Sequence, residues 1–241
     1  MKLAVVIPCY NERGSIPLIV KRMNETFEGR DNVDVILVDN GSTDGSDAVF
    51  DAQLEGQDFM RCIKVSQNVG YGHGILFGID AAADADVYAW THADMQTDPR
   101  DVLTAFDLLC LEGIETNIVQ GKRGKRAALD ALFTFAMQVI ATAALGAKVN
   151  DVNAQPKVFS KHFFDSNIRG QAPLDFSLDL FLLYKARKAG ISILTVPVIF
   201  AERLHGQAKG GGNWRTRVKL IKRTLAYIFE LRQSLKKGMA E

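Results

Sequence analysis

The chain has 241 residues, of which 47% are hydrophobic and 24% charged, and its formal net charge at pH 7 is +1. This composition is typical of a soluble globular protein with a substantial core. The near-neutral charge excludes general nucleic-acid binding, because no positive field would attract phosphate backbones. Three scattered cysteines without a CxxC spacing indicate neither a disulfide framework nor a zinc site. Because the apolar run 3–7 is too short for a secretory signal, we expect a mature cytoplasmic protein.

Short apolar runs typical of β-strands alternate with helical patterns in the first half of the chain. We predict strands over 3–7, 35–38, 62–65 and 87–90, and helices over 16–27, 47–54, 74–83 and 102–111. Ser15 and Ser46 stand where helix N-caps are expected. Strand–helix units of about 30 residues indicate βαβ units, and continuous apolar strands indicate that both sheet faces are covered. The sequence therefore predicts an α/β fold with a mostly parallel central sheet flanked by helices.

The second half of the chain is less regular. Further strands are predicted over 118–120 and 193–200, and helices over 178–189 and from about 216 to 235. The apolar segment 131–147 is shorter than the roughly 20 residues that span a bilayer, which favours a buried or interface-lying helix. We expect a catalytic domain over 1–213 and a basic amphipathic helix over 214–241.

The predicted C-terminal helix carries an apolar stripe surrounded by lysines and arginines. The stripe consists of Val218, Ile221, Leu225, Ile228 and Leu235, with Leu220 and Leu231 at its margins. One interpretation is that this stripe packs on the domain. The other is that the helix is an interfacial anchor, attracted to anionic lipid by its basic residues.

Polar loops follow four of the predicted strands directly. They are 8–12 (PCYNE), 39–45 (DNGSTDG), 67–74 (QNVGYGHG) and 92–96 (HADMQ). Because the carboxyl ends of parallel strands meet at one edge of an α/β sheet, where such sheets bind ligands, we expect the site there.

The segment 92–96 offers ligands for a metal ion. In an extended segment, His92, Asp94 and Gln96 share one face. A carboxylate and an amide carbonyl are hard oxygen ligands that suit Mg²⁺ or Mn²⁺, which also bind a diphosphate. The alternative is an ordinary helix start, in which Thr97 or Asp98 accepts from free amides. The two interpretations use different residues, so both can hold.

The segment 39–45 also permits two interpretations. Asp39 can accept hydrogen bonds from a nucleobase, or the segment can be a turn that starts a helix. The glycines at 70, 72 and 74 lack the dinucleotide-binding spacing. Neither a P-loop nor a G-x-S-x-G motif is present, which argues against dehydrogenases, P-loop proteins and α/β-hydrolases.

These segments, in this order, resemble the family 2 glycosyltransferases, in particular the branch with dolichyl- and polyprenyl-phosphate sugar synthases. The resemblance rests on 6–12, 38–45 and 93–99, with later blocks at 121–123, 151–159 and 185–209. It covers roughly residues 3–210. It implies a nucleotide-sugar-binding fold of the GT-A type and an inverting, metal-assisted sugar transfer.

The resemblance assigns residues to the donor. The positions expected to bind the nucleotide are Pro8, Tyr10, Glu12, Asp39, Asn68, Gly70 and Asp94. Asp94 and Gln96 are expected to hold Mg²⁺ or Mn²⁺ and, through it, the diphosphate. The chain departs from the family at two positions. His92 replaces the first Asp of Asp-x-Asp, and Asn40 replaces the second Asp of the turn.

A second set of residues is expected to act on the leaving diphosphate or the acceptor. The basic members are Arg123, Arg126, Arg203 and Lys209, and the alternative for them is a set of solvated basic loops. Asp179 falls at the family's acidic position near the acceptor and Asp175 is its rival. The simpler explanation of both is a helix-surface carboxylate. Together with Asp94 and Arg203, Asp179 completes the expected catalytic set.

The sequence thus predicts a glycosyltransferase on the inner face of the membrane. It would move a hexose from a UDP- or GDP-sugar to a polyprenyl or dolichyl phosphate. One alternative acceptor is a growing polysaccharide or O-antigen glycan. A different class of function, motivated by His92, is a nucleotide-sugar-binding protein with weak or lost catalysis.

Overall fold

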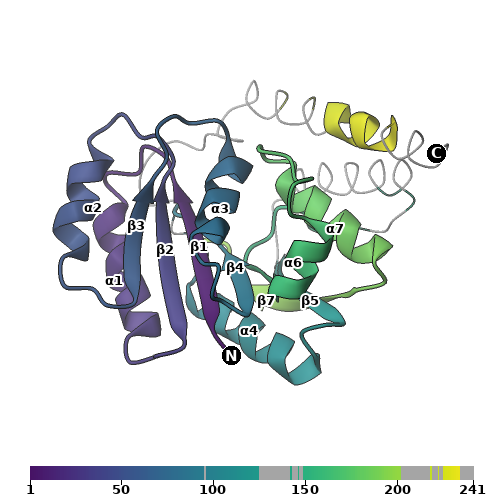
Figure 1. Ribbon diagram of the computed structural model, residues 1–241, viewed down its shortest axis with the longest axis horizontal. Coiled ribbons are helices and arrows are strands. Elements are labelled where there is room, and N and C mark those ends of the chain that lie inside the picture. Colours follow the sequence, from purple (N-terminus) through teal and green to yellow (C-terminus); the bar gives the residue numbers. More distant parts are fainter. Residues whose placement is uncertain are drawn as a thin grey trace.

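A computed structural model of the chain describes residues 1–94, 96–124, 149–201 and 225–233, together with residues 142, 146, 218 and 222. The strands in these residues are β1 (Leu3–Cys9), β2 (Val33–Asp39), β3 (Met60–Lys64), β4 (Val87–Trp90), β5 (Asn117–Arg123), β6 (Lys157–Ser160) and β7 (Ser192–Val198). They form one sheet in the order β3-β2-β1-β4-β6-β5-β7 (Figure 1).

The sheet is mostly parallel, as the sequence predicts. β1 pairs in parallel with β2 and β4, β2 with β3, and β5 with β7. The exception is β6, which runs antiparallel to both β4 and β5. The sequence did not predict β6, because its four residues include a lysine, Lys157, which interrupts the apolar pattern of a buried strand.

Helices cover both faces of the sheet. They are α1 (Ile16–Phe27), α2 (Ser46–Leu54), α3 (Tyr71–Asp80), α4 (Arg100–Glu112), α6 (Lys161–Asn167) and α7 (Leu178–Lys188). Side chains of α3, α6 and α7 share a hydrophobic cluster with one face, and those of α1, α2 and α4 share a cluster with the other. In Figure 1 the helices α3, α6 and α7 lie in front of the sheet. Since strands such as β2 are buried along their whole length, the expectation of a sheet covered on both faces is confirmed.

Several helix starts differ from the prediction. Ser46 is the first residue of α2 rather than its N-cap, which is Gly45, and α4 begins at Arg100 rather than at residue 102. Ser15 precedes α1, but its backbone is already helical and its hydroxyl donates to Glu12 Oε2 (3.0 Å), so it does not cap the helix. Helix α3 begins at Tyr71 rather than at residue 74. The glycine-rich sequence gives no sign of this start, because the first turn of α3 is held by a contact with a distant segment. The N–H of His73 donates to the carbonyl of Leu174 (2.9 Å).

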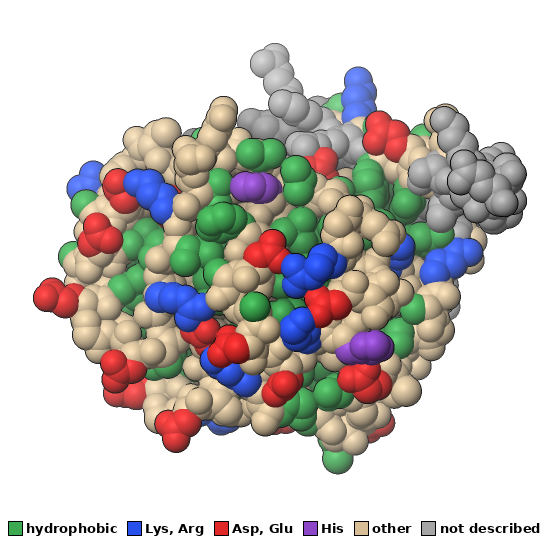
Figure 2. Space-filling view, in the orientation of Figure 1, with side chains coloured by type: hydrophobic (Ala, Val, Ile, Leu, Met, Phe, Trp, Pro, Cys, Tyr) green, Lys and Arg blue, Asp and Glu red, His purple; other side chains and the backbone are tan. Residues whose placement is uncertain are grey.

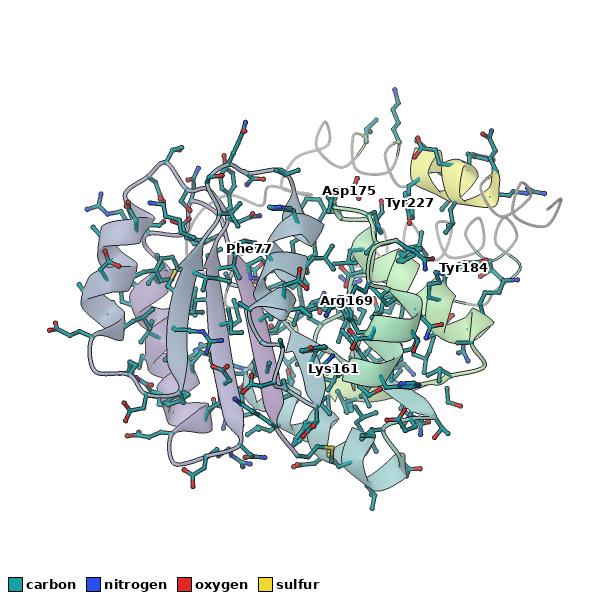
Figure 3. The ribbon with its side chains drawn as sticks, in the orientation of Figure 1. Phe77, Lys161, Arg169, Asp175, Tyr184 and Tyr227 are labelled. Atoms are coloured by element: carbon teal, nitrogen blue, oxygen red, sulfur yellow. The ribbon has the colours of Figure 1, made fainter. Side chains whose placement is uncertain are left out.

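Residues 225–233 are helical and lie on the α7 side of the molecule (Figure 1). Ile228 is fully buried in the same hydrophobic cluster as α7, and Leu231 is 9% exposed. Tyr227 lies beside Asp175 (Figure 3), and its pKa is raised by burial and, to a smaller extent, by that carboxylate. At these positions the predicted stripe packs on the domain.

The lipid-anchor interpretation is not tested by the described residues. The apolar segment 131–147, apart from residues 142 and 146, and most of 214–241 lie outside the described residues. No helix among the described residues is long and apolar enough to cross a membrane. On the face shown in Figure 2, acidic and basic side chains are interspersed.

The tight contact between α3 and the sheet can be tested at Gly78. A Cβ at this position would lie 2.4 Å from Val6 Cγ1 and 3.0 Å from Val38 Cγ2. Alanine favours a helix by about 1 kcal/mol over glycine, but overpacking costs about 1–3 kcal/mol. We therefore expect Gly78→Ala to lower the free energy of unfolding by about 1 kcal/mol net, as measured by urea denaturation. Gly124→Ala, at a position with nothing within 4 Å, is the control; a Gly78→Ala variant as stable as this control would contradict the contact.

Candidate functional site

The carboxyl ends of four neighbouring strands meet at one edge of the sheet. In the parallel ladders Cys9 of β1 pairs with Asp39 of β2, and Asp39 pairs with Lys64 of β3. On the other side of β1, Val6 pairs with Trp90, the last residue of β4. The loops 8–12, 39–45 and 67–74 and the segment 92–94 therefore begin at the same edge, as the sequence predicts.

The first two of these loops are tied together by hydrogen bonds. The N–H of Asn11 donates to Ser42 Oγ (3.0 Å), and the N–H of Thr43 donates to Asn11 Oδ1 (2.8 Å). Asn11 has a φ of 52°, a left-handed conformation that asparagine tolerates better than most residues. The half-buried Pro8, Tyr10 and Glu12 belong to the loop that these bonds hold.

Asp39 is a buried carboxylate with one uncommitted oxygen. It is 1% exposed, and its Oδ1 accepts from the N–H of Ser42 (2.9 Å). Its Oδ2 is buried without a hydrogen-bond partner in the described part of the chain. A buried carboxylate oxygen that lacks a donor is costly, so a ligand N–H at this position would satisfy it. Asp39 is thus suited to receive a nucleobase.

Asn40 connects the second loop to the third. Its Nδ2 donates to the carbonyl of Gly70 (2.9 Å). The loops approach so closely that a Cβ on Gly41 would lie 2.5 Å from the backbone N of Asn68, and one on Gly70 would lie 2.3 Å from the carbonyl oxygen of Leu174. An ionised aspartate at position 40 could not donate to Gly70. This contact gives a physical reason for the asparagine at position 40, where the family that the sequence resembles usually has an aspartate.

Asp94 and Gln96 place oxygen atoms next to this edge. Asp94 is 8% exposed, and its Oδ1 accepts from the N–H of Gln96 (3.2 Å). Gln96 is fixed by Ala201, because its Nε2 donates to the carbonyl of Ala201 (3.0 Å) and its own carbonyl accepts from the N–H of Ala201 (2.9 Å). Since the amide nitrogen is committed, the Oε1 of Gln96 is the atom that remains to bind a cation. The helix-start interpretation holds as well, because Asp98 Oδ1 accepts from the N–H of Arg100 (2.9 Å).

His92 lies against an aromatic ring. Its ring centroid is 6.0 Å from that of Tyr71, which in turn stacks on Phe176 at 4.9 Å. The pKa of Tyr71 is raised well above its usual value by burial and by the nearby Asp179 and Asp94 carboxylates. No three His, Cys, Asp or Glu side chains among the described residues form a metal site by themselves.

The donor set nevertheless fits a Mg²⁺ or Mn²⁺ ion shared with a ligand. Such an ion is commonly held by one or two carboxylates plus substrate phosphates, rather than enclosed by protein alone. Asp94 and Gln96 would supply two oxygens, and a bound diphosphate would supply others.

Asp179 lies inside the protein rather than on a helix surface, so the helix-surface explanation is wrong for it. It is 3% exposed, and its Oδ1 accepts from Trp90 Nε1 (3.1 Å) and from Gln155 Nε2 (3.0 Å). Lys157 Nζ lies 3.6 Å from the same oxygen. Its rival Asp175 is half-buried and accepts from the N–H of Ser177 (2.7 Å) just before α7.

Sequence analysis missed Gln155 and Lys157. Both stand within a block that supported the family resemblance, but neither was assigned a role. The available signal was Lys157 directly before the apolar pair Val158 and Phe159, where a buried charge would require a partner.

Arg123 forms an ion pair, so a solvated turn is the wrong description of it. Its Nε and Nη2 donate to Asp151 Oδ1 (2.9 and 2.5 Å), and its N–H donates to Asp151 Oδ2 (2.9 Å). The guanidinium also lies 5.5 Å from the centroid of the Phe200 ring. Arg126, Arg203 and Lys209, expected to bind phosphate groups, lie outside the described residues.

The thiol of Cys62 on β3 has a raised pKa. Burial raises this pKa to about 12, with a smaller contribution from the Asp39 carboxylate. Because the thiolate is the reactive form, the raised pKa argues against Cys62 as a catalytic nucleophile.

Comparison with known families assigns the chain. The model of Glycosyl transferase family 2 matches residues 4–137 of the 241, so the chain belongs to this family. It is similar to an undecaprenyl-phosphate 4-deoxy-4-formamido-L-arabinose transferase from Aeromonas hydrophila, with 24% identity over 87% of this chain and 63% of that protein. It is also similar to a polyprenol monophosphomannose synthase from Mycolicibacterium smegmatis, with 24% identity over 87% of this chain and 81% of that protein. The chain thus spans less than two thirds of the length of the Aeromonas relative.

Solved structures identify the fold as GT-A. Glucosyl-3-phosphoglycerate synthase from Mycobacterium tuberculosis, in complex with Mn²⁺, UDP-glucose and phosphoglyceric acid, has a TM-score of 0.71 at 16% identity, over 96% of this chain and 80% of that one. A mannosyltransferase from Pyrobaculum calidifontis, in complex with GDP-mannose and Mn²⁺, has a TM-score of 0.66 at 20% identity, over 95% of this chain and 64% of that one. The predicted fold is confirmed.

The contact from Asn40 to Gly70 predicts a pH-dependent defect in Asn40→Asp. An ionised carboxylate cannot donate to the Gly70 carbonyl, whereas a protonated one can. We expect the variant to lose about 1–3 kcal/mol of unfolding free energy at pH 8 and less at pH 5, because the stabilising protonated form is lost as the pH rises. Urea denaturation at both pH values measures this difference.

Asn32→Asp is the matched control, because Asn32 makes the same kind of bond, from Nδ2 to the carbonyl of Met1 (3.1 Å), on the exposed surface. Equal effects of the two substitutions would mean that the bond to Gly70 has no special importance.

Proposed function

We propose that this protein transfers a hexose from a UDP- or GDP-sugar to a polyprenyl phosphate, with inversion at the anomeric carbon. The observation that carries the proposal is the buried, unpartnered Oδ2 of Asp39, at the same sheet edge as the oxygens of Asp94 and Gln96. Family membership supports sugar transfer, and the two relatives named for polyprenyl- and undecaprenyl-phosphate transfer support the acceptor.

In this proposal the nucleotide binds across the first three loops. Asp39 Oδ2 accepts from the base, while Pro8, Tyr10 and Glu12 line the loop that Asn11 ties to Ser42 and Thr43. Asn68 and Gly70 offer backbone groups to the nucleotide. The loops that carry them can pack this closely because Gly41 and Gly70 have no side chains.

The diphosphate lies near Asp94 and Gln96. Departure of a nucleoside diphosphate concentrates negative charge on its oxygens, so groups that stabilise this charge act mainly in the transition state. A Mg²⁺ or Mn²⁺ ion bound by Asp94 and Gln96 would supply this stabilisation as a Lewis acid. Both solved relatives described above bind Mn²⁺, which supports the choice of metal. Arg203 and Lys209 are proposed to assist at the diphosphate.

The acceptor phosphate attacks the anomeric carbon from the face opposite the diphosphate. A phosphate oxygen forms the new bond to carbon while the bond from carbon to the diphosphate oxygen breaks. Because the phosphate is already ionised, no general base is needed. This agrees with the position of Asp179, whose Oδ1 is committed to Trp90 and Gln155. Arg123 and Arg126 are proposed to orient the acceptor phosphate.

A nucleotide-sugar-binding protein with weak catalysis is the second candidate. The observation in its favour concerns His92, which stands at the first position of the Asp-x-Asp pattern and stacks on Tyr71. Asp94 is then the one carboxylate that this pattern supplies for a cation. Purified protein incubated with labelled UDP- and GDP-sugars, Mn²⁺ and undecaprenyl phosphate separates the two. Product formation supports transfer, whereas tight donor binding without transfer or donor hydrolysis supports the second candidate. Transfer to a glycan and not to the lipid phosphate would support the polysaccharide acceptor.

The role of Asp39 predicts a binding defect in Asp39→Ala. Loss of a hydrogen bond to a charged group costs about 1.5–3 kcal/mol, which corresponds to a rise of about 10- to 100-fold in the donor Kd. Since the base is held equally in ground and transition states, kcat should change little. Calorimetry with UDP and GDP measures the Kd. Asp47→Ala, which removes an exposed carboxylate paired with Lys64, is the control, and wild-type affinity for both nucleotides in Asp39→Ala would exclude this role.

The role of Asp94 predicts a catalytic defect in Asp94→Asn. Removing one carboxylate from the diphosphate cation should lower kcat by about 100-fold or more, with the fold intact. The assay compares wild type and variant with added Mn²⁺, and wild type with EDTA. Asp98→Asn, which removes a charge four residues away, is the control. Full activity of wild type in EDTA, or of Asp94→Asn with added Mn²⁺, would rule out the metal assignment.

A further inference from the structure

Lys157 places a positive charge in the interior of the protein. It lies in β6, and its side chain is 0% exposed. Burial lowers the pKa of Lys157, and the Asp179 carboxylate opposes this shift. An ammonium group in such a place is costly unless acceptors surround it, so its partners indicate what the charge achieves.

The first partners of Lys157 are backbone carbonyls of the segment 149–156. Its Nζ donates to the carbonyl of Val152 (2.7 Å) and to that of Ala154. Asp151 stands next to Val152 and holds the guanidinium of Arg123 through Nε and Nη2. Lys157 therefore holds the backbone at Val152, directly after Asp151, the residue that orients Arg123.

The second partner is Asp179 on α7. Its Oδ1 lies 3.6 Å from Lys157 Nζ and accepts the indole N–H of Trp90 (3.1 Å). Trp90 is the last residue of β4, and the segment that follows carries Asp94. Through Asp179, Lys157 therefore also fixes the start of the segment that presents the cation ligand.

These two sets of contacts lie on opposite sides of the proposed reaction. Arg123 is on the acceptor side and Asp94 on the diphosphate side. β6, which carries Lys157, lies between β4 and β5 in the sheet and pairs with both. The ammonium group of Lys157 contacts the backbone next to Asp151, which holds Arg123, and the carboxylate of Asp179, which holds Trp90.

We propose that Lys157 is a positioning residue of the transfer site, which holds Arg123 and Asp94 in a fixed relative arrangement through Asp151 on one side and through Asp179 and Trp90 on the other. This inference rests on the proposed function. In sugar transfer the acceptor oxygen must meet the anomeric carbon in line with the leaving diphosphate, and small displacements of the two sides are costly.

Hydrogen–deuterium exchange tests the positioning without requiring activity. In Lys157→Met, peptides covering 90–96 and 149–156 should exchange faster than in wild type, whereas those covering 8–12 and 39–45 should not change. Lys161→Met is the matched control, because Lys161 is a few residues along, on the surface, in an ion pair with Asp165. Faster exchange in only one of the two segments, in neither, or equally in all four peptides would overturn the proposal.

Steady-state kinetics tests the consequence for transfer. Supporting contacts of this kind typically change activity by about 10- to 100-fold, so we expect kcat/KM for the lipid phosphate to fall by that factor in Lys157→Met. The Kd for UDP or GDP measured in EDTA, where Asp94 holds no cation, should stay at the wild-type value, because the contacts of Lys157 with Val152, Ala154 and Asp179 lie outside the nucleotide loops. A purely structural role would weaken nucleotide binding and transfer together, which would count against the proposal.

A double variant covers the case in which Lys157→Met fails to fold. Lys157→Met combined with Asp179→Asn removes both charges, so no uncompensated carboxylate remains buried. We expect faster exchange over 149–156 in this variant, because the carbonyl contacts are still lost. Wild-type exchange and wild-type transfer would show that Lys157 only neutralises Asp179. If wild-type protein transfers no sugar, the proposed function fails, while the exchange data still decide the positioning role.

Discussion

Parallel pairing of β1 with β2 on one side and β4 on the other is the constraint on which the site depends. Because these strands run in the same direction, Asp39 and the segment after Trp90 emerge at one edge, although the residues are far apart in the sequence. The ladders position the polar residues, while hydrophobic clusters on both faces hold the strands. Backbone hydrogen bonding therefore fixes the distance between the proposed base contact and the proposed cation ligands.

Hydrogen bonds join the loops at this edge to one another. Asn11 joins the first loop to the second, and Asn40 joins the second to the third. Glycines at 41 and 70 permit backbone contacts that any Cβ would prevent. A ligand that meets such prearranged loops loses less free energy to ordering them, which favours binding.

Much of this arrangement could be predicted from the sequence. Apolar strands such as 35–38, followed at once by polar loops, predict both the parallel sheet and the edge where ligands bind. The short strand β6 and the helix α6 that follows it were not predicted, because Lys157 breaks the apolar pattern and the strands that pair with β6, β4 and β5, lie far from it in the sequence. The burial of Asp179 was missed for the same reason: helical periodicity places it on a helix but does not reveal the indole and amide groups that face it.

The raised thiol pKa of Cys62 makes this residue a natural probe of the nucleotide edge. Cys62 lies on β3, next to the strand that ends at Asp39, and its thiol is almost wholly protonated at neutral pH. Alkylating reagents react with the thiolate, so labelling of this half-buried thiol should be slow at neutral pH. A ligand bound at this edge would slow the labelling in proportion to its occupancy. The rate at which Cys62 is alkylated, with and without donor, would therefore report donor binding in the native protein, without any introduced cysteine.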